Sequence, residues 1–229
     1  FETVKRHRPT LFFSVPSNFA SLLPYAEHCQ DCDLSSVRHA VSAGEALTAA
    51  IFHRFKQRFR VEILDAIGST EALHMFIANR PGAARPGSSG QIIEGNEAKI
   101  VDEENNPVPD GEIGNLLIRS DAVCSHYWNR HEQTKNTIEG HWVRTGDKYY
   151  RDGEGYFWYA GRSDDMLKCS GAWVSPVEIE NVLIEHAAVQ EAAVIGRQDQ
   201  DSLLKLMACI VLKNGKPDGF KLYAIRPSS

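Results

Sequence analysis

Apolar residues recur along the first 80 positions with two different spacings. Three short apolar runs each predict a β-strand, the first of them buried and ending at Pro16. They are PTLFFSVP (9–16), VRHAVSAGEAL (37–47, entering a small-residue loop) and VEILDAI (61–67). Two stretches between them have the spacing of helices; they are SNFASLLPYAEH (17–28) and TAAIFHRFKQRF (48–59), the second with Ile51, Phe55 and Phe59 on its apolar face. This alternation predicts a mostly parallel sheet with helices on its faces.

The pattern changes after residue 84. Short strand-like segments are now separated by turn residues such as NNPVPDG and RDGEG, which predicts an antiparallel or barrel-like β region. The segments are EAKIVD (97–102), GEIGNLLIRS (111–120) and GYFWYAGR (155–162).

A third pattern follows the segment GRSDD (161–165). Ser175 and Glu178 match the capping box of a helix, with Pro176 in its first turn. The apolar face of this helix consists of Ile179, Val182 and Leu183, and two strands, 190–196 and 205–212, come after it.

These patterns predict the α/β fold class with three parts. Residues 1–84 form an α/β part, and residues 85–164 form a β-rich part. Residues 165–229 form the start of a small α+β C-terminal domain.

Composition and charge narrow the function classes. The chain has 229 residues, 42% hydrophobic and 24% charged, with a formal net charge of −5, which argues against a nucleic-acid surface or a basic membrane patch. No apolar run is long enough to span a bilayer and no signal-peptide pattern opens the chain, although residue 1 is Phe and targeting cannot be judged from this end. We expect a cytoplasmic protein without nucleic-acid or membrane partners, with a homo-oligomer as an open option.

The five cysteines do not resemble a secreted disulfide framework, because their number is odd and their spacing scattered. Cys29 and Cys32 form one C-x-x-C after His28. A zinc site normally needs a second ligand pair, and none follows, so we interpret them as ordinary loop cysteines rather than a metal or redox site.

The turn GSTE (68–71) directly follows a predicted strand, where ligands bind in open α/β sheets. The Thr70 hydroxyl and the turn amides suit a phosphate, and the Glu71 carboxylate suits Mg²⁺. Ser69 or Thr70 could instead cap the following helix, with Glu71 in its first turn. His74 is expected one helical turn beyond Thr70 and Glu71, facing the same cleft, or else packed or exposed beside Met75 and Phe76.

Three further stretches carry candidate chemistry, each with a structural alternative. Ala43 and Gly44 in SAGEAL (42–47) leave room for a flat ring, or merely turn the chain. Asp147 and Arg162 suit a diol and a phosphate, or form a surface pair. Lys168 beside the Gly171 loop is a candidate catalytic group or a solvated lysine.

Jointly these segments closely resemble the acyl-adenylate-forming (AMP-binding) enzyme superfamily, most like its benzoate–CoA ligase branch. The resemblance extends from about Pro9 to Leu212. It is carried by SAGEAL, LDAIGSTEALHMF, GEIGNLLIRS, YWN and WVRTGDKYYRDGEGYFWYAGRSDDMLKCSGAWVSPVEIE. It implies an ATP- and Mg²⁺-dependent ligase that activates a small aryl carboxylic acid as acyl-AMP and then transfers the acyl group to coenzyme A.

The resemblance implies that residues 1–84 and 85–164 are subdomains of one large AMP-binding domain, incomplete at its N-terminus, and that residues 165–229 are part of a C-terminal lid domain. It also implies residue roles. Thr70, Glu71 and Lys168 would be catalytic, with Glu71 as the metal ligand and Asp164 as the hinge of the small domain. The implied nucleotide-binding residues are Ser42, Ala43, Gly44, Glu45, Asp65, Ile67, Gly68, Thr70, Asp147 and Arg162. The implied acyl pocket is built from Phe13, Ser14, Val15, Ala43 and His74, and the loop on the coenzyme A side from Lys168, Ser170, Gly171 and Trp173.

Two segments of the family pattern do not occur in these residues. One is a Ser/Thr/Gly-rich phosphate loop ending in Pro-Lys, and the other is the lysine of a Pro-Lys-Thr-x-x-Gly-Lys segment. We therefore expect the chain to be the middle of a longer enzyme or a truncated gene product, catalytically inactive by itself. Two alternatives stay open: an adenylation domain with a carrier-protein acceptor, and a non-catalytic nucleotide-binding or assembly module.

Overall fold

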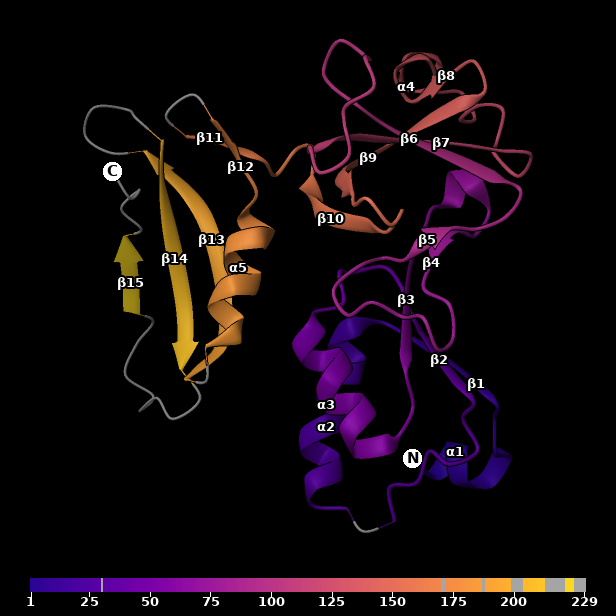
Figure 1. The fold of residues 1–229 in the computed structure, drawn as a ribbon, viewed down its shortest axis with the longest axis vertical. Coiled ribbons are helices and arrows are strands. Elements are labelled where there is room, and N and C mark those ends of the chain that lie inside the picture. Colours follow the sequence, from indigo (N-terminus) through magenta and orange to yellow (C-terminus); the bar gives the residue numbers. More distant parts are fainter. Residues whose placement is uncertain (30, 170–171, 187, 199–203, 213–220, 225–229) are drawn as a thin grey trace. The chain divides into compact units, whose positions relative to one another are not determined.

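The computed structural model describes residues 1–29, 31–169, 172–186, 188–198, 204–212 and 221–224 (Figure 1). These residues divide into two compact units, one of residues 1–145 with 149–159 and one of residues 146–148 with 160–229. The first unit contains two separate hydrophobic clusters, one drawn from residues 19–63 and one from residues 72–157. The boundaries at residues 84 and 164 stay a prediction.

The first unit opens with a five-stranded sheet in the order β1-β2-β3-β4-β5. Its strands are β1 (Leu11–Ser14), β2 (His39–Ser42), β3 (Ile63–Gly68), β4 (Met75–Ala78) and β5 (Gln91–Ile92). The expected parallel pairing holds for β1 with β2 and β2 with β3. β4 and β5 are antiparallel to their neighbours, because the chain turns straight back after Gly68 rather than crossing over through a helix.

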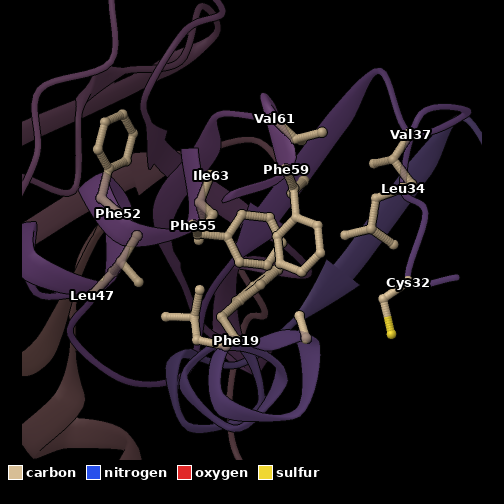
Figure 2. Close-up of a cluster of buried hydrophobic side chains, with 13 residues drawn as sticks. Phe19, Cys32, Leu34, Val37, Leu47, Phe52, Phe55, Phe59, Val61 and Ile63 are labelled. Atoms are coloured by element: carbon tan, nitrogen blue, oxygen red, sulfur yellow. The ribbon is translucent and has the colours of Figure 1, made fainter. Parts of the chain in front are cut away.

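Two helices cover this sheet and supply its core (Figures 1 and 2). They are α2 (Pro16–Glu27) and α3 (Ala49–Phe59); a short helix, α1 (Glu2–His7), precedes β1. The rings of Phe19 and Phe55 meet edge to face with centroids 5.1 Å apart, and Phe59 lies 4.7 Å beyond Phe55. The Thr48 side chain caps α3 by accepting a hydrogen bond from the Ile51 amide.

The buried face of α3 differs slightly from the expected one. Phe52, Phe55 and Phe59 are buried, whereas Ile51 is only partly buried. A spacing of three and then four residues follows one helical face more closely than two spacings of four.

The expectation that β1 is a buried strand is wrong. Leu11 and Phe13 are 48% and 55% exposed, while Phe12 packs against Phe19 with ring centroids 5.6 Å apart. Successive side chains of a strand point to opposite faces of the sheet: Phe12 lies on the face covered by α2, and Leu11 and Phe13 lie on the other face.

The second sheet of the chain confirms the antiparallel β region. Its order is β10-β9-β7-β6, with β8 paired to β9, and it is accompanied by one short helix. These elements are β6 (Asn96–Val101), β7 (Gly114–Ser120), α4 (His131–Thr137), β8 (Ile138–Glu139), β9 (Trp142–Arg151) and β10 (Phe157–Arg162). Phe76, Leu116 and Tyr149 are among the buried side chains of its cluster.

The second unit has a hairpin, one helix and a three-stranded sheet in the order β13-β14-β15. Its elements are β11 (Leu167–Cys169), β12 (Ala172–Val174), α5 (Pro176–Glu185), β13 (Val189–Gln198), β14 (Leu204–Leu212) and β15 (Lys221–Ala224). Ser175 caps α5 as expected, with its hydroxyl accepting from the Glu178 amide. Val182, placed on the apolar face by the sequence, is 68% exposed, so that part of the prediction is wrong.

Two further observations concern the cysteines and the possibility of a membrane span. Cys29 and Cys32 form a disulfide with their Cα atoms 5.5 Å apart, which corrects their interpretation as ordinary loop cysteines. The loop after α2 brings the two side chains together, and Cys32 is buried against the first cluster. Within the described residues, no helix is both long and apolar enough to cross a membrane.

Candidate functional site

Three polar residues stand side by side near the carboxyl ends of neighbouring parallel strands in the first unit: Ser14 and Ser42 end β1 and β2, and Asp65 lies three residues before the end of β3. Ser14 of β1 is in register with Ser42 of β2, and Ser42 is in register with Asp65 of β3. Because parallel strands end at the same edge of a sheet, these residues and the loops after them are brought together. This edge is therefore the first candidate for ligand binding.

Ser42 and Asp65 are both buried, with Ser42 Oγ and Asp65 Oδ1 lacking a hydrogen-bond partner. Burial raises the pKa of Asp65 to about 8. The nearby Ser42 hydroxyl, which does not reach hydrogen-bond geometry, and the backbone at Leu47 and Ala66 offset only part of that rise. Most buried polar atoms in proteins are satisfied, so two orphaned oxygens at one strand edge mark an unusual polar environment.

The 42–47 loop lies against the start of α2. The Ala43 amide donates to the Ser14 carbonyl at 3.3 Å, and a side chain at Gly44 would come within 3.7 Å of Val15 Cγ1. The Glu45 carboxylate accepts from both the amide and the hydroxyl of Ser17, each at 3.2 Å. The structure thus brings together residues that the sequence assigned to an adenine slot and to an acyl pocket.

The 68–74 segment is a tight reversal and not the start of a helix. Ser69 accepts a hydrogen bond from the Ala72 amide and caps a single 3-10 turn, Thr70–Ala72, as the capping alternative predicted. The chain then leaves the turn through Leu73, whose φ is +67°. The expectation that His74 lies one helical turn beyond Thr70 is wrong, because the helix does not continue to it.

Gly68 permits this reversal. A side chain at Gly68 would lie 2.4 Å from the His74 carbonyl oxygen, so the backbone closes only on a glycine. Thr70 and His74 are exposed, and Glu71 and Ile67 are partly buried. Ile67 packs against the second cluster.

Glu71 is held by a segment far along the chain. The Tyr127 hydroxyl donates to Glu71 Oε1 at 2.5 Å, and the Cys124 amide donates to the Glu71 carbonyl at 2.7 Å. Burial, followed by the bond to the Glu71 carboxylate, raises the pKa of Tyr127 to about 12. Sequence reasoning missed Tyr127, because nothing local in YWN points to residue 71.

The donor set at Glu71 fits a nucleotide-bound magnesium ion. Across the part of the chain that the structure describes, no three His, Cys, Asp or Glu side chains are grouped closely enough to hold a metal. Mg²⁺ commonly binds through one or two carboxylates with substrate phosphates completing its shell. A single glutamate beside a turn with an exposed hydroxyl, that of Thr70, suits this mode of binding.

Asp147 and Arg162 form an ion pair in the second unit. Arg162 Nη1 donates to Asp147 Oδ1 at 3.0 Å, with the Asp147 side chain only 14% exposed. Gly146 has a φ of +79° and leaves room for the guanidinium: a side chain there would lie 2.8 Å from Arg162 Nη2, so the arginine would have to shift. The two side chains are therefore paired, as the structural alternative expected, although Asp147 is mostly buried. The pair presents a carboxylate and a guanidinium together, and its role in ligand binding stays a prediction.

The other predicted residues of the second unit lie in a turn and a hairpin. Asp164 is exposed in the turn between β10 and β11. Lys168 of β11 is in register with Trp173 of β12. Ser170 and Gly171, predicted for the coenzyme A side, lie outside the described residues.

The chain matches two protein-family descriptions. Residues 1–128 match the AMP-binding enzyme family, and residues 178–224 match the AMP-binding enzyme C-terminal domain.

Similar proteins include curated ligases and a solved structure. The benzoate–CoA ligase of Thauera aromatica is 46% identical over 94% of this chain and 41% of its own length. The 4-hydroxybenzoate–CoA/benzoate–CoA ligase of Rhodopseudomonas palustris is 42% identical over 93% of this chain and 39% of its own length. A crystal structure of an anthranilate CoA ligase in complex with anthranoyl-AMP has a TM-score of 0.86 and 50% identity, covering 95% of this chain and 42% of that one. The chain thus spans about two fifths of the length of the relatives it matches.

Proposed function

The chain belongs to the AMP-binding enzyme family, and we propose that it serves the ATP-dependent activation of an aryl carboxylic acid and its transfer to coenzyme A. The arrangement at the carboxyl ends of β2 and β3 carries this proposal. The loop 42–47 follows one strand and the turn 68–71 follows its parallel neighbour, so both stand at the same sheet edge. Such an edge is where open α/β sheets bind nucleotides.

The proposed roles in the first unit follow this edge. The backbone of 42–45 forms the adenine slot, with Asp65 and Ile67 behind it. Gly68 and Thr70 contact the phosphates, and Glu71 binds Mg²⁺. Because Ser42 and Asp65 are buried, we propose that they hold the backbone of the slot in place and contact the ligand only over a small area.

The proposed roles in the second unit concern other parts of the ligands. The Asp147 carboxylate accepts from the ribose hydroxyls, and Arg162 holds Asp147 and donates to ligand oxygens. Asp164 is the proposed hinge, and Lys168 and Trp173 belong to the proposed coenzyme A side.

The proposed reaction has two steps, formation of the acyl-AMP and then of the thioester. A carboxylate oxygen of the acid attacks the α-phosphorus of ATP, and the bond to the β-phosphate breaks to release pyrophosphate. The coenzyme A thiolate then attacks the acyl carbon, and the bond to the AMP oxygen breaks to release AMP. When bound, Mg²⁺ neutralises phosphate charge in the first step.

The proposed acid is a small aryl carboxylate. Two contacts support this choice: the Ala43 amide donates to the Ser14 carbonyl, and Gly44, which has no side chain, stands next to Val15. Small residues at 43 and 44 leave room for a flat ring beside the end of β1. Benzoate, hydroxybenzoates and anthranilate are the acids named for the similar ligases, and we propose this class for the present protein.

Acid-dependent pyrophosphate exchange tests the proposal. The full-length protein is incubated with ATP, labelled pyrophosphate and each of benzoate, 4-hydroxybenzoate, anthranilate and acetate. We expect exchange into ATP with an aryl acid and little with acetate. Exchange that is independent of any aryl acid would refute the proposal.

Acceptor choice is measured in the same preparation. Thioester formation with coenzyme A is compared with transfer to a phosphopantetheinylated carrier protein, and the proposal expects coenzyme A. A parallel assay of the 229-residue chain tests the expectation that it is inactive by itself.

A further inference from the structure

The Glu71 turn is tied to the segment 124–137 by side chain and backbone together. The Tyr127 hydroxyl donates to the Glu71 carboxylate at 2.5 Å, and the Cys124 amide donates to the Glu71 carbonyl at 2.7 Å. A phenol in this position is a neutral donor, so the Glu71 carboxylate keeps its negative charge. A lysine or arginine in the same place would instead compete with a bound cation.

Tyr127 is itself held in place. Its amide donates to Thr134 Oγ1 at 3.0 Å, and Thr134 Oγ1 donates to the Arg130 carbonyl at 2.9 Å. The Thr137 side chain at the end of α4 also acts on the phenol and offsets part of the rise in its pKa. These contacts restrain the position from which the Tyr127 hydroxyl donates to Glu71.

We propose that Tyr127 is a positioning residue that orients the Glu71 carboxylate toward a nucleotide-bound divalent cation. This inference rests on the proposed function. Groups that hydrogen-bond to a metal ligand fix its orientation, and their removal typically weakens metal binding or activity by about 10- to 100-fold.

Manganese binding to the full-length protein tests this role without relying on turnover. Mn²⁺ is titrated by electron paramagnetic resonance in the presence of a non-hydrolysable ATP analogue. We expect Tyr127→Phe to weaken Mn²⁺ binding by about tenfold, the lower end of the range for lost partners of metal ligands. Glu71→Gln should weaken it further.

Tyr156→Phe is the matched control. The Tyr156 hydroxyl donates to the Ala83 carbonyl at 2.9 Å, so this variant also loses one phenol hydrogen bond. Its Mn²⁺ affinity should equal that of the wild type. Thermal unfolding of both variants separates loss of fold from loss of metal binding.

A double variant separates positioning from a general structural effect. If Tyr127 acts through Glu71, adding Tyr127→Phe to Glu71→Gln should change Mn²⁺ binding no further. Should Tyr127→Phe fail to fold, Thr137→Val removes the hydroxyl that also acts on the phenol, and we expect a smaller loss of Mn²⁺ affinity.

The outcomes distinguish this inference from the function on which it rests. Wild-type Mn²⁺ affinity in Tyr127→Phe, together with a loss in Glu71→Gln, would overturn the positioning role alone. Wild-type affinity in Glu71→Gln would overturn the metal assignment of the proposed function. Absence of any nucleotide-dependent Mn²⁺ binding to the wild type would refute both.

Discussion

Ser42, the last residue of β2, stands in register with Asp65 in the middle of the parallel strand β3, and each has one buried oxygen without a hydrogen-bond partner. Burial disfavours the charged carboxylate, which is why the pKa of Asp65 rises to about 8. Near neutral pH the group is therefore mostly protonated. A neutral carboxyl behind the proposed adenine slot can donate a hydrogen bond as well as accept one.

Asp65 predicts a specific pH dependence of stability. The pKa of this carboxyl rises from 3.8 to about 8 on folding, so between these values the folded chain retains a proton that the unfolded chain has released. The free energy of unfolding then falls as pH rises through this window, by at most about 1.4 kcal/mol per pH unit. Asp65→Asn cannot ionise and should lose this contribution. Urea unfolding of both proteins across the window measures it, and parallel pH profiles would contradict the assignment.

Gly146→Ala should disrupt the ion pair beside it. A methyl group at this position would lie 2.8 Å from Arg162 Nη2, and the backbone φ is +79°. We expect nucleotide affinity, measured by calorimetry on the full-length protein, to fall about tenfold, as for a lost charged hydrogen bond.

Gly140→Ala separates this contact from backbone strain. Its φ is +65°, and a side chain there would meet nothing within 4 Å. Both variants should lose about 1 kcal/mol of stability from the positive φ. Equal nucleotide affinity in the two variants would count against a role of the Arg162–Asp147 pair in binding.

Asp147→Asn should raise the KM for ATP while leaving the fold intact. The change keeps the shape of the side chain but removes the charge that accepts from ribose hydroxyls and pairs with Arg162. We expect an increase of about tenfold or more, on the scale of a lost hydrogen bond to a charged group. Asp110→Asn is the matched control, because Asp110 also pairs with an arginine, Arg151, at 2.8 Å. Unchanged ATP kinetics in Asp147→Asn would refute the ribose assignment.

Glu45 should stabilise α2 through its N-terminus. Its carboxylate accepts from the Ser17 amide in the first turn of the helix, where negative charge is favourable. Glu45→Gln should lower stability by about 0.3–1 kcal/mol and increase amide exchange in the 42–47 loop. Glu27→Gln, at the other end of the same helix, should be neutral or slightly stabilising. Identical effects of the two changes would argue against this account of Glu45.

Local sequence signals predicted much of the fold. The helix at 176–185 was predictable from Ser175 and Glu178 because the cap is formed within four residues of chain. The parallel β1-β2-β3 core likewise follows from the alternation of strands and helices. The exposed face of β1 was not predictable, since the uninterrupted apolar run LFF does not reveal that only one face of this strand is covered.

The candidate site was only partly predictable, because some of its contacts join residues that are far apart in the sequence. Residues 42–47 and 68–71 could be assigned because each follows a predicted strand directly. The Tyr127–Glu71 contact joins residues 56 positions apart, and no spacing rule reaches that far. His74 was misplaced because the steric need for Gly68 and the positive φ of Leu73 end the helix after one turn.

Oxygen-isotope transfer tests the central claim most directly. The full-length protein is given ATP, Mg²⁺, coenzyme A and benzoate carrying ¹⁸O in its carboxylate, and the released AMP is examined by mass spectrometry. Activation through acyl-AMP predicts one ¹⁸O atom in AMP for each thioester formed, because the attacking oxygen stays on phosphorus when the thiolate displaces AMP. Thioester formation with unlabelled AMP would contradict the account.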